Sequence, residues 1–406
     1  MKLTAIISEF NPFHNGHKYI VEQARLLTNC DALICVISPN FTQRAEPSVS
    51  CVYTRAAAAL SSKVDAVISM PTLYSTASGE KFSQGAINIL NSIPNISHLV
   101  FGSECSNIEL LKKAASVQVK EPVQFKEVLS SELDKGTAYA KAISLATCAS
   151  DPNLTNFCIN SPNDILAVEY LKELLRTNSS ITPLTVKRQG GGFHDTKLHP
   201  DFSSASSIRE CITNNKLVKA KNAMPKESYK LIRNDLKSSN KNFYNDFSLL
   251  VLHSLRTENL NQLADCVEGL EHKLYKNAME SSSLQTVLEH TKSKRYTFSR
   301  LRRLALQSLL NITHYPDLQN FPLPARLIGI KENLKDILLP LMPTNIIIKE
   351  TDIEKYASLL DYASLLDNEK KGHLEYIENI EQKANKVYGL IKRIDNFAKP
   401  RKLLTI

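Results

Sequence analysis

The 406-residue sequence lacks the features of several protein classes. No apolar stretch approaches the roughly 18 residues that would suggest a membrane span, and the start "MKLTAIISEF" has no signal-peptide pattern, because charged residues and helix breakers follow too soon. The eight cysteines form no C-x-x-C pair, so neither a zinc knuckle nor a dithiol redox site is indicated. We therefore expect a soluble cytoplasmic protein with reduced cysteines and no membrane partner. Its hydrophobic content of 43% is sufficient for a sizeable core.

The pattern of the first half of the chain predicts its fold. Short β-branched runs lie at 3–8, 32–38, 64–69, 98–102 and 184–188. The helices expected between and after them cover roughly residues 17–28, 53–62, 79–92, 105–117, 163–176 and 204–214. This alternation is typical of a parallel sheet covered by helices, and runs that are apolar throughout fit strands buried on both faces. We therefore predict a doubly wound, Rossmann-like α/β domain over residues 1–220.

The rest of the chain has a different pattern. Residues 119–160 look helical and irregular, and we interpret them as an insertion between the fourth and fifth strands. From about residue 225 the β-branched runs mostly disappear, and apolar residues recur at helical spacing, as in "LRRLALQSLLNI". We therefore predict a second, mainly α-helical domain over residues 221–406.

The loop after the first strand carries side chains suited to catalysis. Its sequence, "EFNPFHNGHKY", places His14 and His17 three residues apart, with Gly16 between them, where a strand ends and a helix begins. In an open parallel sheet ligands collect at this edge, and a helix N-terminus offers free N–H groups and partial positive charge to a phosphate. The two imidazoles would stabilise developing charge on the phosphates of ATP by electrostatic catalysis. Alternatively, both histidines only cap and pack the turn, but the H-x-G-H arrangement favours the functional interpretation.

The same string resembles a known family. H-x-G-H is the pattern of a nucleotidyltransferase superfamily, and the fuller string is similar to that of the bacterial tRNA(Met) cytidine acetate ligases. Further motifs of this family occur in the same order: "NFTQRAEPS" (40–48), "TRAAAAL" (54–60), "FGSE" (101–104), "SPNDILAVEYL" (161–171), "KRQGGGFHD" (187–195), "SSASSIR" (203–209) and "KRYTFSRLRR" (294–303). Each motif is weak by itself, but their shared order over most of the chain makes the resemblance specific.

The resemblance implies an ATP site with His14, His17 and Arg188 as catalytic residues. The ATP-binding positions that carry over are Ile7, Ser8, Glu9, Phe10, Asn11, Pro12, Phe13, His14, Asn15, Gly16, His17, Lys18, Tyr19, Ile20, Gly102, Asn163 and Arg188. Gly102 would let the backbone approach a base or ribose closely, Asn163 can pair with polar atoms, and Arg188 offers a planar fork to phosphates. From the residues alone, Gly102 could equally mark a turn, and Asn163 could cap the next helix.

Two further motifs have open roles. Ser206, Ser207 and Arg209 resemble a serine-rich helix start that grips nucleotide phosphates across this superfamily, although an ordinary N-cap is about as good an interpretation. The segment "NFTQRAEPS" (40–48) departs from the family pattern, which favours glycine where this chain has Pro39 and Ala45, although Gln43, Arg44 and Glu46 remain. We therefore assign no individual roles in that segment.

A basic segment in the second half suggests an RNA partner. The chain has a net charge of +9, and the segment contains Lys292, Lys294, Arg295, Arg300, Arg302 and Arg303 without an acidic residue, interleaved with aromatic side chains. This composition suits an RNA backbone with bases that can stack. Such a run is often only a solvated face, but its occurrence in a chain that resembles tRNA-modifying enzymes favours tRNA binding. We expect the segment to lie away from the strand ends that hold ATP.

The activity that the resemblance implies is an ATP-dependent ligation. Acetate attacks the α-phosphate of ATP to give acetyl-adenylate and pyrophosphate, and the exocyclic amine of the wobble cytidine of elongator tRNA(Met) then takes the acetyl group. Mg²⁺ would accompany ATP, and we expect neither a protein metal site nor an obligate protein partner. No acetyl-CoA phosphate-binding signature is evident, which favours free acetate. Two alternatives remain open: a small-molecule nucleotidyltransferase, which would not need the helical domain, and a tRNA-binding protein whose nucleotide site is only regulatory.

Overall fold

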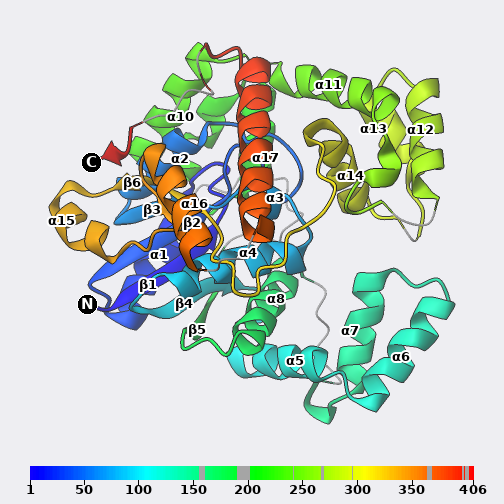
Figure 1. The fold of residues 1–406 in the computed structure, drawn as a ribbon, viewed down its shortest axis with the longest axis horizontal. Coiled ribbons are helices and arrows are strands. Elements are labelled where there is room, and N and C mark those ends of the chain that lie inside the picture. The colour runs from blue at the N-terminus through cyan, green and yellow to red at the C-terminus, as the bar shows by residue number, and fades with distance from the viewer. Residues whose placement is uncertain are drawn as a thin grey trace.

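The structure is organised around one central sheet (Figure 1). The computed structural model describes residues 1–154, 161–189, 202–240, 242–266, 269–294, 296–363, 368–395, 397 and 402–406. Over these residues the strands are β1 (Leu3–Ser8), β2 (Ala32–Ile37), β3 (Ala66–Ser69), β4 (Ile96–Ser103), β5 (Thr182–Lys187), β6 (Ala325–Ile330), β7 (Ile346–Ile347) and β8 (Leu404–Thr405). Their order is β5-β4-β1-β2-β3-β6-β7, and β8 pairs with β6.

The first five strands are parallel, and their apolar sequences reflect burial on both faces. Along β1, Leu3, Ala5 and Ile7 belong to the core on one face of the sheet, whereas Ile6 belongs to the core on the other face. Both faces require apolar side chains because helices cover both of them. The predicted α/β class with a doubly wound parallel part is therefore confirmed.

Helices surround this sheet and form most of the second half of the chain. In chain order they are α1 (Asn15–Thr28), α2 (Val52–Leu60), α3 (Thr72–Ser75), α4 (Gly79–Ser92), α5 (Ile108–Lys120), α6 (Val123–Asp134), α7 (Tyr139–Ala149), α8 (Pro162–Arg176), α9 (Ala205–Thr213), α10 (Lys226–Ser238), α11 (Phe243–Thr257), α12 (Leu270–Glu280), α13 (Leu284–Thr291), α14 (Phe298–Leu310), α15 (Lys335–Leu338), α16 (Thr351–Ala363) and α17 (Asn368–Lys392). Apolar side chains of α1 and α2 pack in the core on one face of the sheet, and those of α4, α5 and α8 pack in the core on the other. In Figure 1, α11–α14 form a lobe at the upper right and α6 and α7 a lobe at the lower right. The predicted helical C-terminal region is confirmed.

The C-terminal half also contributes strands that the sequence analysis missed. β6 runs antiparallel to β3 and pairs Leu327 with Ile68, and β7 and β8 run parallel to β6. The string "ARLIGI" stands alone among helical patterns, and its partner strand lies far away in the sequence. No local pattern could therefore reveal the pairing. The sheet is therefore mixed rather than wholly parallel, and strands from both sides of residue 220 share it. The division of the chain into two domains near that residue stays a prediction.

The long helix α17 is tied to the loop that follows β2. Lys392, whose side chain is completely buried, donates a hydrogen bond to the carbonyl of Val49 at 2.8 Å. The hydroxyl of Tyr388 donates to the carbonyl of Ser48 at 3.0 Å. The C-terminal helix therefore supports a loop at the carboxyl edge of the sheet.

Two expectations from composition can be compared with this fold. None of the described helices has the length and apolar character needed to cross a membrane. The described cysteines, namely Cys30, Cys35, Cys51, Cys105, Cys148, Cys211 and Cys266, are free thiols, and Cys158 lies outside the described residues.

Gly85 of α4 provides a test of the packing between α3 and α4. A Cβ atom at this position would lie 2.7 Å from Cβ and 2.9 Å from Cγ of the buried Tyr74. Gly372 of α17 is the matched control, because it is also helical but an added Cβ would meet nothing within 4 Å. Alanine is favoured over glycine in helices by about 1 kcal/mol, so Gly372→Ala should stabilise the protein slightly, whereas Gly85→Ala should destabilise it by about 1 to 3 kcal/mol. Urea unfolding measures both effects, and equal stabilities would contradict the close packing.

Candidate active site at the carboxyl ends of β1 and β4

The strand order changes direction between β1 and β4. The chain proceeds from β1 to β2 and β3 on one side, and β4 and β5 lie on the other side. In open α/β sheets the loops diverge at such a point and leave a crevice where ligands bind. A cavity of about 1050 Å³ lies here, and Ser8, Glu9 and Gly102 are part of its lining.

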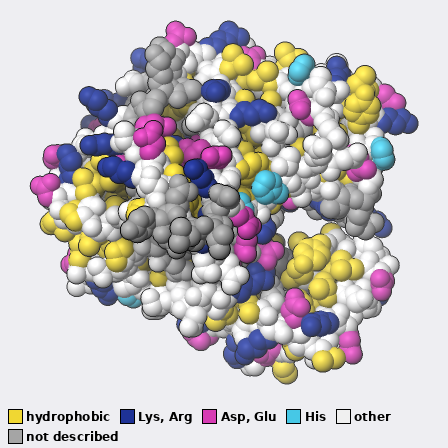
Figure 2. Space-filling model, in the orientation of Figure 1, with side chains coloured by type: hydrophobic (Ala, Val, Ile, Leu, Met, Phe, Trp, Pro, Cys, Tyr) yellow, Lys and Arg dark blue, Asp and Glu magenta, His cyan; other side chains and the backbone are white. Residues whose placement is uncertain are grey.

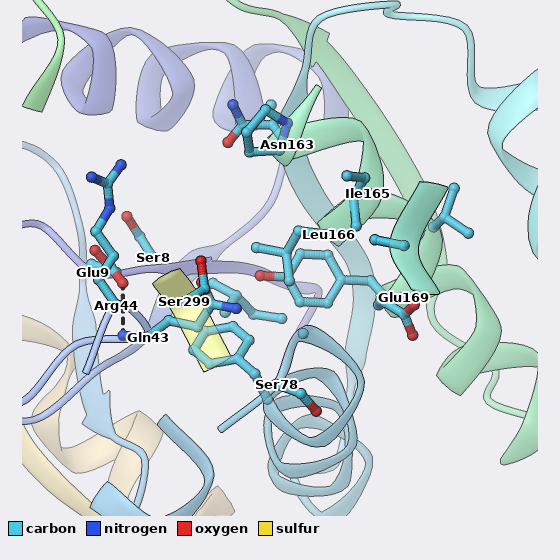
Figure 3. Close-up of a pocket in the computed structure, with 18 of the residues that line it drawn as sticks. Ser8, Glu9, Gln43, Arg44, Ser78, Asn163, Ile165, Leu166, Glu169 and Ser299 are labelled. Carbon is cyan, nitrogen blue, oxygen red and sulfur yellow. Dashed lines mark hydrogen bonds between the residues drawn. The ribbon is translucent and has the colours of Figure 1, made fainter. Parts of the chain in front are cut away.

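The cavity has walls from distant parts of the chain. Glu9 follows β1, Arg44 follows β2, Asn163 and Leu166 belong to α8, and Ser299 belongs to α14. Figure 3 shows Glu9 and Arg44 on one side of the pocket, Leu166 on the opposite side and Asn163 above them. Both halves of the sequence therefore enclose one common space.

His14 and His17 form a reciprocal cap at the N-terminus of α1. Nδ1 of His14 accepts a hydrogen bond from the N–H of Gly16 at 3.0 Å, and Nδ1 of His17 accepts one from the N–H of His14 at 3.3 Å. A neutral imidazole then carries its proton on Nε2. Both rings line the cavity, so the capping role fixes the tautomer in which His14 can donate to a ligand. The capping interpretation and the functional one are therefore compatible.

Gly16 is required by this arrangement rather than by an unusual backbone conformation. A Cβ atom on Gly16 would lie 2.8 Å from Cε1 and 3.0 Å from Nδ1 of His14. A larger residue would therefore displace the imidazole and break the hydrogen bond that orients it.

Burial keeps both imidazoles neutral at physiological pH. Loss of solvation lowers the pKa of His14 to about 3, and the charges of Arg188 and Arg209 act in the same direction. Loss of solvation also lowers the pKa of His17 well below its usual value, with His14 and Arg188 adding to the effect. A hydrogen bond to the backbone of Pro12 opposes this shift only in part. Two neutral rings thus lie beside two permanent cations.

The other residues of the predicted ATP loop differ in whether they line the cavity. The cavity lining includes Ile7, Ser8, Glu9, Asn11, Gly16, Tyr19 and Ile20 together with the two histidines. Outside it lie Phe10, Pro12, Phe13, Asn15 and Lys18. Phe10 and Phe13 are completely buried, and their ring centroids lie 5.0 and 5.7 Å from that of His17. These two phenylalanines support the imidazole from the core side.

Glu104 connects two of the predicted ATP residues, Asn163 and Arg188. Its carboxylate accepts a hydrogen bond from the Asn163 amide at 2.5 Å and lies 3.8 Å from Nε of Arg188. A Cβ atom on Gly102 would lie 3.2 Å from Cγ of Arg188, so the glycine leaves room for that side chain. The motif "FGSE" contains Glu104, but sequence reasoning gave this residue no role; its signal was an acidic residue directly after a buried strand.

The start of α8 shows whether Asn163 is the N-cap of this helix, as the sequence had left open. Ser161 is the N-cap of this helix and accepts a hydrogen bond from the N–H of Asp164 at 3.3 Å. The interpretation of Asn163 as the N-cap is therefore wrong. The carboxylate of Asp164 is buried and accepts from the N–H of Glu104 at 3.0 Å, which fixes α8 against the end of β4.

The serine-rich start of α9 lies beside the histidine loop. Arg209 donates to the carbonyl of Asn11 at 2.9 Å and to the hydroxyl of Ser206 at 3.0 Å. Ser204 is the N-cap, accepting from the N–H of Ser207 at 3.1 Å. Ser206 and Arg209 line the cavity, whereas Ser207 is buried behind it. The roles of these residues toward phosphate stay predictions.

The segment 39–48 forms a tight loop at the edge of the cavity. Ala45 adopts a φ of 56°, the left-handed conformation that glycine favours, so the turn is retained although the family's glycine is absent. The N–H of Gln43 donates to the carboxylate of Glu9 at 2.9 Å, as the dashed line in Figure 3 shows. Arg55, which is completely buried and which sequence reasoning missed, donates to the carbonyls of Glu9 at 2.5 Å and Ser38 at 2.9 Å. Arg55 thereby holds the ends of β1 and β2 together.

The basic segment lies closer to the cavity than expected. Arg300 and Arg303 of α14 are part of the cavity lining, so the expectation that the segment lies away from the strand ends is wrong. Helix propensity does not reveal this placement, because the position of α14 depends on how α11 and α14 pack against α17.

The side chains of the basic segment differ in their partners. Arg302 forms an ion pair with Glu46 at 2.7 Å, and Arg303 forms one with Asp265 at 3.3 Å. Lys292 and Lys294 are exposed, and Arg295 lies outside the described residues. The arginines therefore brace the wall of the cavity, and the lysines face the solvent.

Comparisons with known proteins agree with this geometry. Residues 1–401 match the family model described as HIGH Nucleotidyl Transferase. A tRNA(Met) cytidine acetate ligase of Clostridium botulinum (strain Okra / Type B1) is 39% identical over 327 residues, which cover 78% of this chain and 80% of that protein. The enzyme of the same name from Caldanaerobacter subterraneus subsp. tengcongensis is 35% identical over 376 residues, or 91% of this chain and 92% of that protein. The chain belongs to the tRNA(Met) cytidine acetate ligase family.

Two solved structures of Thermotoga maritima TmcAL are similar to this chain in fold over its whole length. The apo form matches with a TM-score of 0.89 and 28% identity, covering 100% of both chains. A second form, bound with alpha-thio ATP, matches with a TM-score of 0.88 and 27% identity over the same coverage. The shared architecture thus includes the helical lobes as well as the sheet.

The buried state of His14 predicts a pH dependence of stability. The unfolded side chain takes up a proton below pH 6.5, whereas the folded one does so only near pH 3, so the free energy of unfolding falls as the pH drops from 7 to 5. His14→Asn retains a side-chain cap acceptor but cannot titrate. Wild type should therefore lose about 2 kcal/mol more than His14→Asn between pH 7 and pH 5. Urea unfolding at pH 5, 6 and 7 measures the free energy of unfolding of both proteins. An equal decrease in wild type and in His14→Asn would show that His14 is not held neutral.

Proposed function

We propose that this protein is an ATP-dependent ligase that activates acetate and acetylates the wobble cytidine of elongator tRNA(Met). The observation that carries the proposal is the pair of neutral, mutually oriented histidines at the N-terminus of α1, inside a cavity of a chain from the ligase family. ATP is the co-substrate, N4-acetylcytidine is the product in tRNA, and AMP and pyrophosphate are released.

The first step transfers the adenylyl group. An acetate oxygen attacks the α-phosphorus of ATP, and the bond to the bridging oxygen of pyrophosphate breaks. Charge that develops on the phosphates is stabilised by the Nε2–H of His14 and by Arg188, together with the partial positive charge at the N-terminus of α1, and His17 acts by orienting His14. Neutral imidazoles suit this role, because they donate hydrogen bonds without giving up a proton.

The second step transfers the acetyl group to RNA. The exocyclic amine of cytidine attacks the carbonyl carbon of acetyl-adenylate, AMP leaves with the electron pair of the broken bond, and the amine loses a proton. This step requires acetyl-adenylate and the base in one space, and the walls from both halves of the chain provide such a space. Both the acetate and the identity of the tRNA belong to the proposal.

Mg²⁺ would accompany ATP in this reaction and neutralise part of its phosphate charge. Within the described part of the chain, no group of three or more His, Cys, Asp or Glu side chains is arranged to hold a metal ion. Mg²⁺ bound with nucleotides relies mainly on phosphate oxygens and water, so the absence of a protein cage is compatible with it. We assign it no protein ligand and no step.

The proposal also covers partners and location. Free acetate and tRNA are the expected partners, no protein partner is required for the chemistry, and the tRNA substrate points to the cytoplasm. Binding of tRNA by the basic segment is supported by the exposure of Lys292 and Lys294 beside a wall of the cavity.

The acyl donor provides the direct test of this function. With ATP, wild type should transfer label from free acetate to tRNA(Met) and should release pyrophosphate in an acetate-dependent manner. His14→Ala should lower the rate of pyrophosphate release by about 100-fold to 1000-fold, because one preorganised donor is removed. Circular dichroism of the variant controls for folding. Label transfer from acetyl-CoA but not from acetate would overturn the proposal.

The exposed lysines give a cleaner test of tRNA binding than the paired arginines. Lys292→Gln combined with Lys294→Gln should weaken tRNA binding and reduce the slope of log affinity against log salt by about one for each phosphate that the protein no longer neutralises. Lys63→Gln with Lys349→Gln is the control, since these lysines are exposed near β3 and β7 and carry the same charge change. Filter binding at several salt concentrations measures both slopes. An equal effect of the two double variants would assign the result to net charge rather than to this segment.

A further inference from the structure

The cavity extends beyond the histidine loop to the hairpin formed by α6 and α7. On this hairpin, Phe125 and Leu129 of α6 and Tyr139 and Ile143 of α7 line the cavity. The two helices pack on each other, and α7 also contacts α5. The hairpin stands apart from the sheet at the lower right of Figure 1, so its inner face forms an outer wall of the cavity.

This wall is apolar and aromatic, unlike the histidine loop. Ile165 and Leu166 of α8 line the cavity from the sheet side, and Figure 3 shows both side chains at one side of the pocket. Figure 2, in the orientation of Figure 1, shows hydrophobic side chains gathered on this lobe where it borders the opening. Tyr139 is 64% exposed, although apolar side chains of the same hairpin, such as Ile143, line the same cavity. An exposed aromatic ring at the mouth of a cavity is an unfilled stacking surface.

The opposite wall carries positive charge. Arg300 and Arg303 of α14 line the same cavity, and the exposed Lys292 and Lys294 precede that helix. One side of the opening therefore suits the phosphates of a nucleic acid, and the other suits the apolar face of a base. This pairing of cations with an aromatic platform is the arrangement that binds single-stranded RNA.

Chemistry inside a cavity requires the base to leave its stack. An exocyclic amine in an RNA loop reaches an enclosed adenylate only when the nucleotide turns out of the loop, and such bases stack on aromatic side chains. We propose that the α6–α7 hairpin receives the target base of the substrate RNA, with the ring of Tyr139 as its stacking partner. This inference rests on the proposed function and names the wall that holds the second substrate.

The surroundings of Tyr139 agree with a place on the inner side of the hairpin. Burial raises the pKa of its hydroxyl, and the carboxylates of Glu80 and Glu169 add to the shift. Both carboxylates line the cavity. Tyr139 and these two carboxylates therefore line one common cavity.

Two substitutions of Tyr139 separate ring stacking from other roles. Tyr139→Ala should lower kcat/KM for tRNA acetylation by about 10-fold to 100-fold, the usual effect of removing the partner of one stacked base. Tyr139→Phe keeps the ring and should remain within about threefold of wild type. Both variants should release pyrophosphate from acetate and ATP without tRNA at the wild-type rate, because the hairpin is remote from the histidine loop in the fold. Tyr275→Ala is the matched control, as Tyr275 is 46% exposed on α12 and lies outside the cavity lining.

The outcomes distinguish this inference from the function on which it rests. Wild-type acetylation of tRNA by Tyr139→Ala would overturn the stacking role and leave the ligase proposal intact. Equal decreases in Tyr139→Ala and Tyr139→Phe would assign the effect to the hydroxyl and also overturn it. Loss of pyrophosphate release in Tyr139→Ala would overturn it as well, by placing the residue in the adenylation step instead. If wild type itself neither released pyrophosphate with acetate nor acetylated tRNA, the ligase proposal would fail first.

Discussion

The capping hydrogen bonds that the His14 and His17 rings accept from the N–H groups of Gly16 and His14 are the constraint on which the site depends. They satisfy N–H groups that the first turn of α1 would leave without partners, and they fix the proton of each neutral ring on Nε2. The same bonds require Gly16, because a side chain there would occupy the space of the His14 ring. Structural capping and the orientation of the proposed catalytic imidazoles are thus one arrangement, and neither can change without the other.

The sheet supports this loop from behind. Phe10 and Phe13 are buried beneath the His17 ring, and the buried guanidinium of Arg55 joins the loops that leave β1 and β2. Desolvation from this packing is the main cause of the low imidazole pKa values. A charged imidazole in this environment would be expensive, so the protein keeps positive charge on Arg188 and Arg209, which cannot lose it.

The helical half of the chain completes the site instead of standing beside it. Arg302 reaches Glu46 in the loop after β2, and Arg300 and Arg303 face the cavity from α14. The insertion between β4 and β5 closes the other side with an apolar wall that includes Tyr139. A cavity enclosed in this way can keep an activated acyl group from water while a second substrate enters, which is the general advantage of closing an active site.

The sequence by itself determined the parts of this protein that depend on short-range patterns. Continuous apolar runs indicated parallel strands buried on both faces, and H-x-G-H directly after the first strand indicated a loop at a helix N-terminus. Both were predictable because burial and capping leave their signals within a few residues. Only the tertiary structure decided that β6 pairs with β3, that Glu104 joins Asn163 to Arg188, and that the basic helix α14 lines the cavity. These contacts join segments far apart in the chain, and their geometry depends on how whole elements pack, which no local pattern of residues encodes.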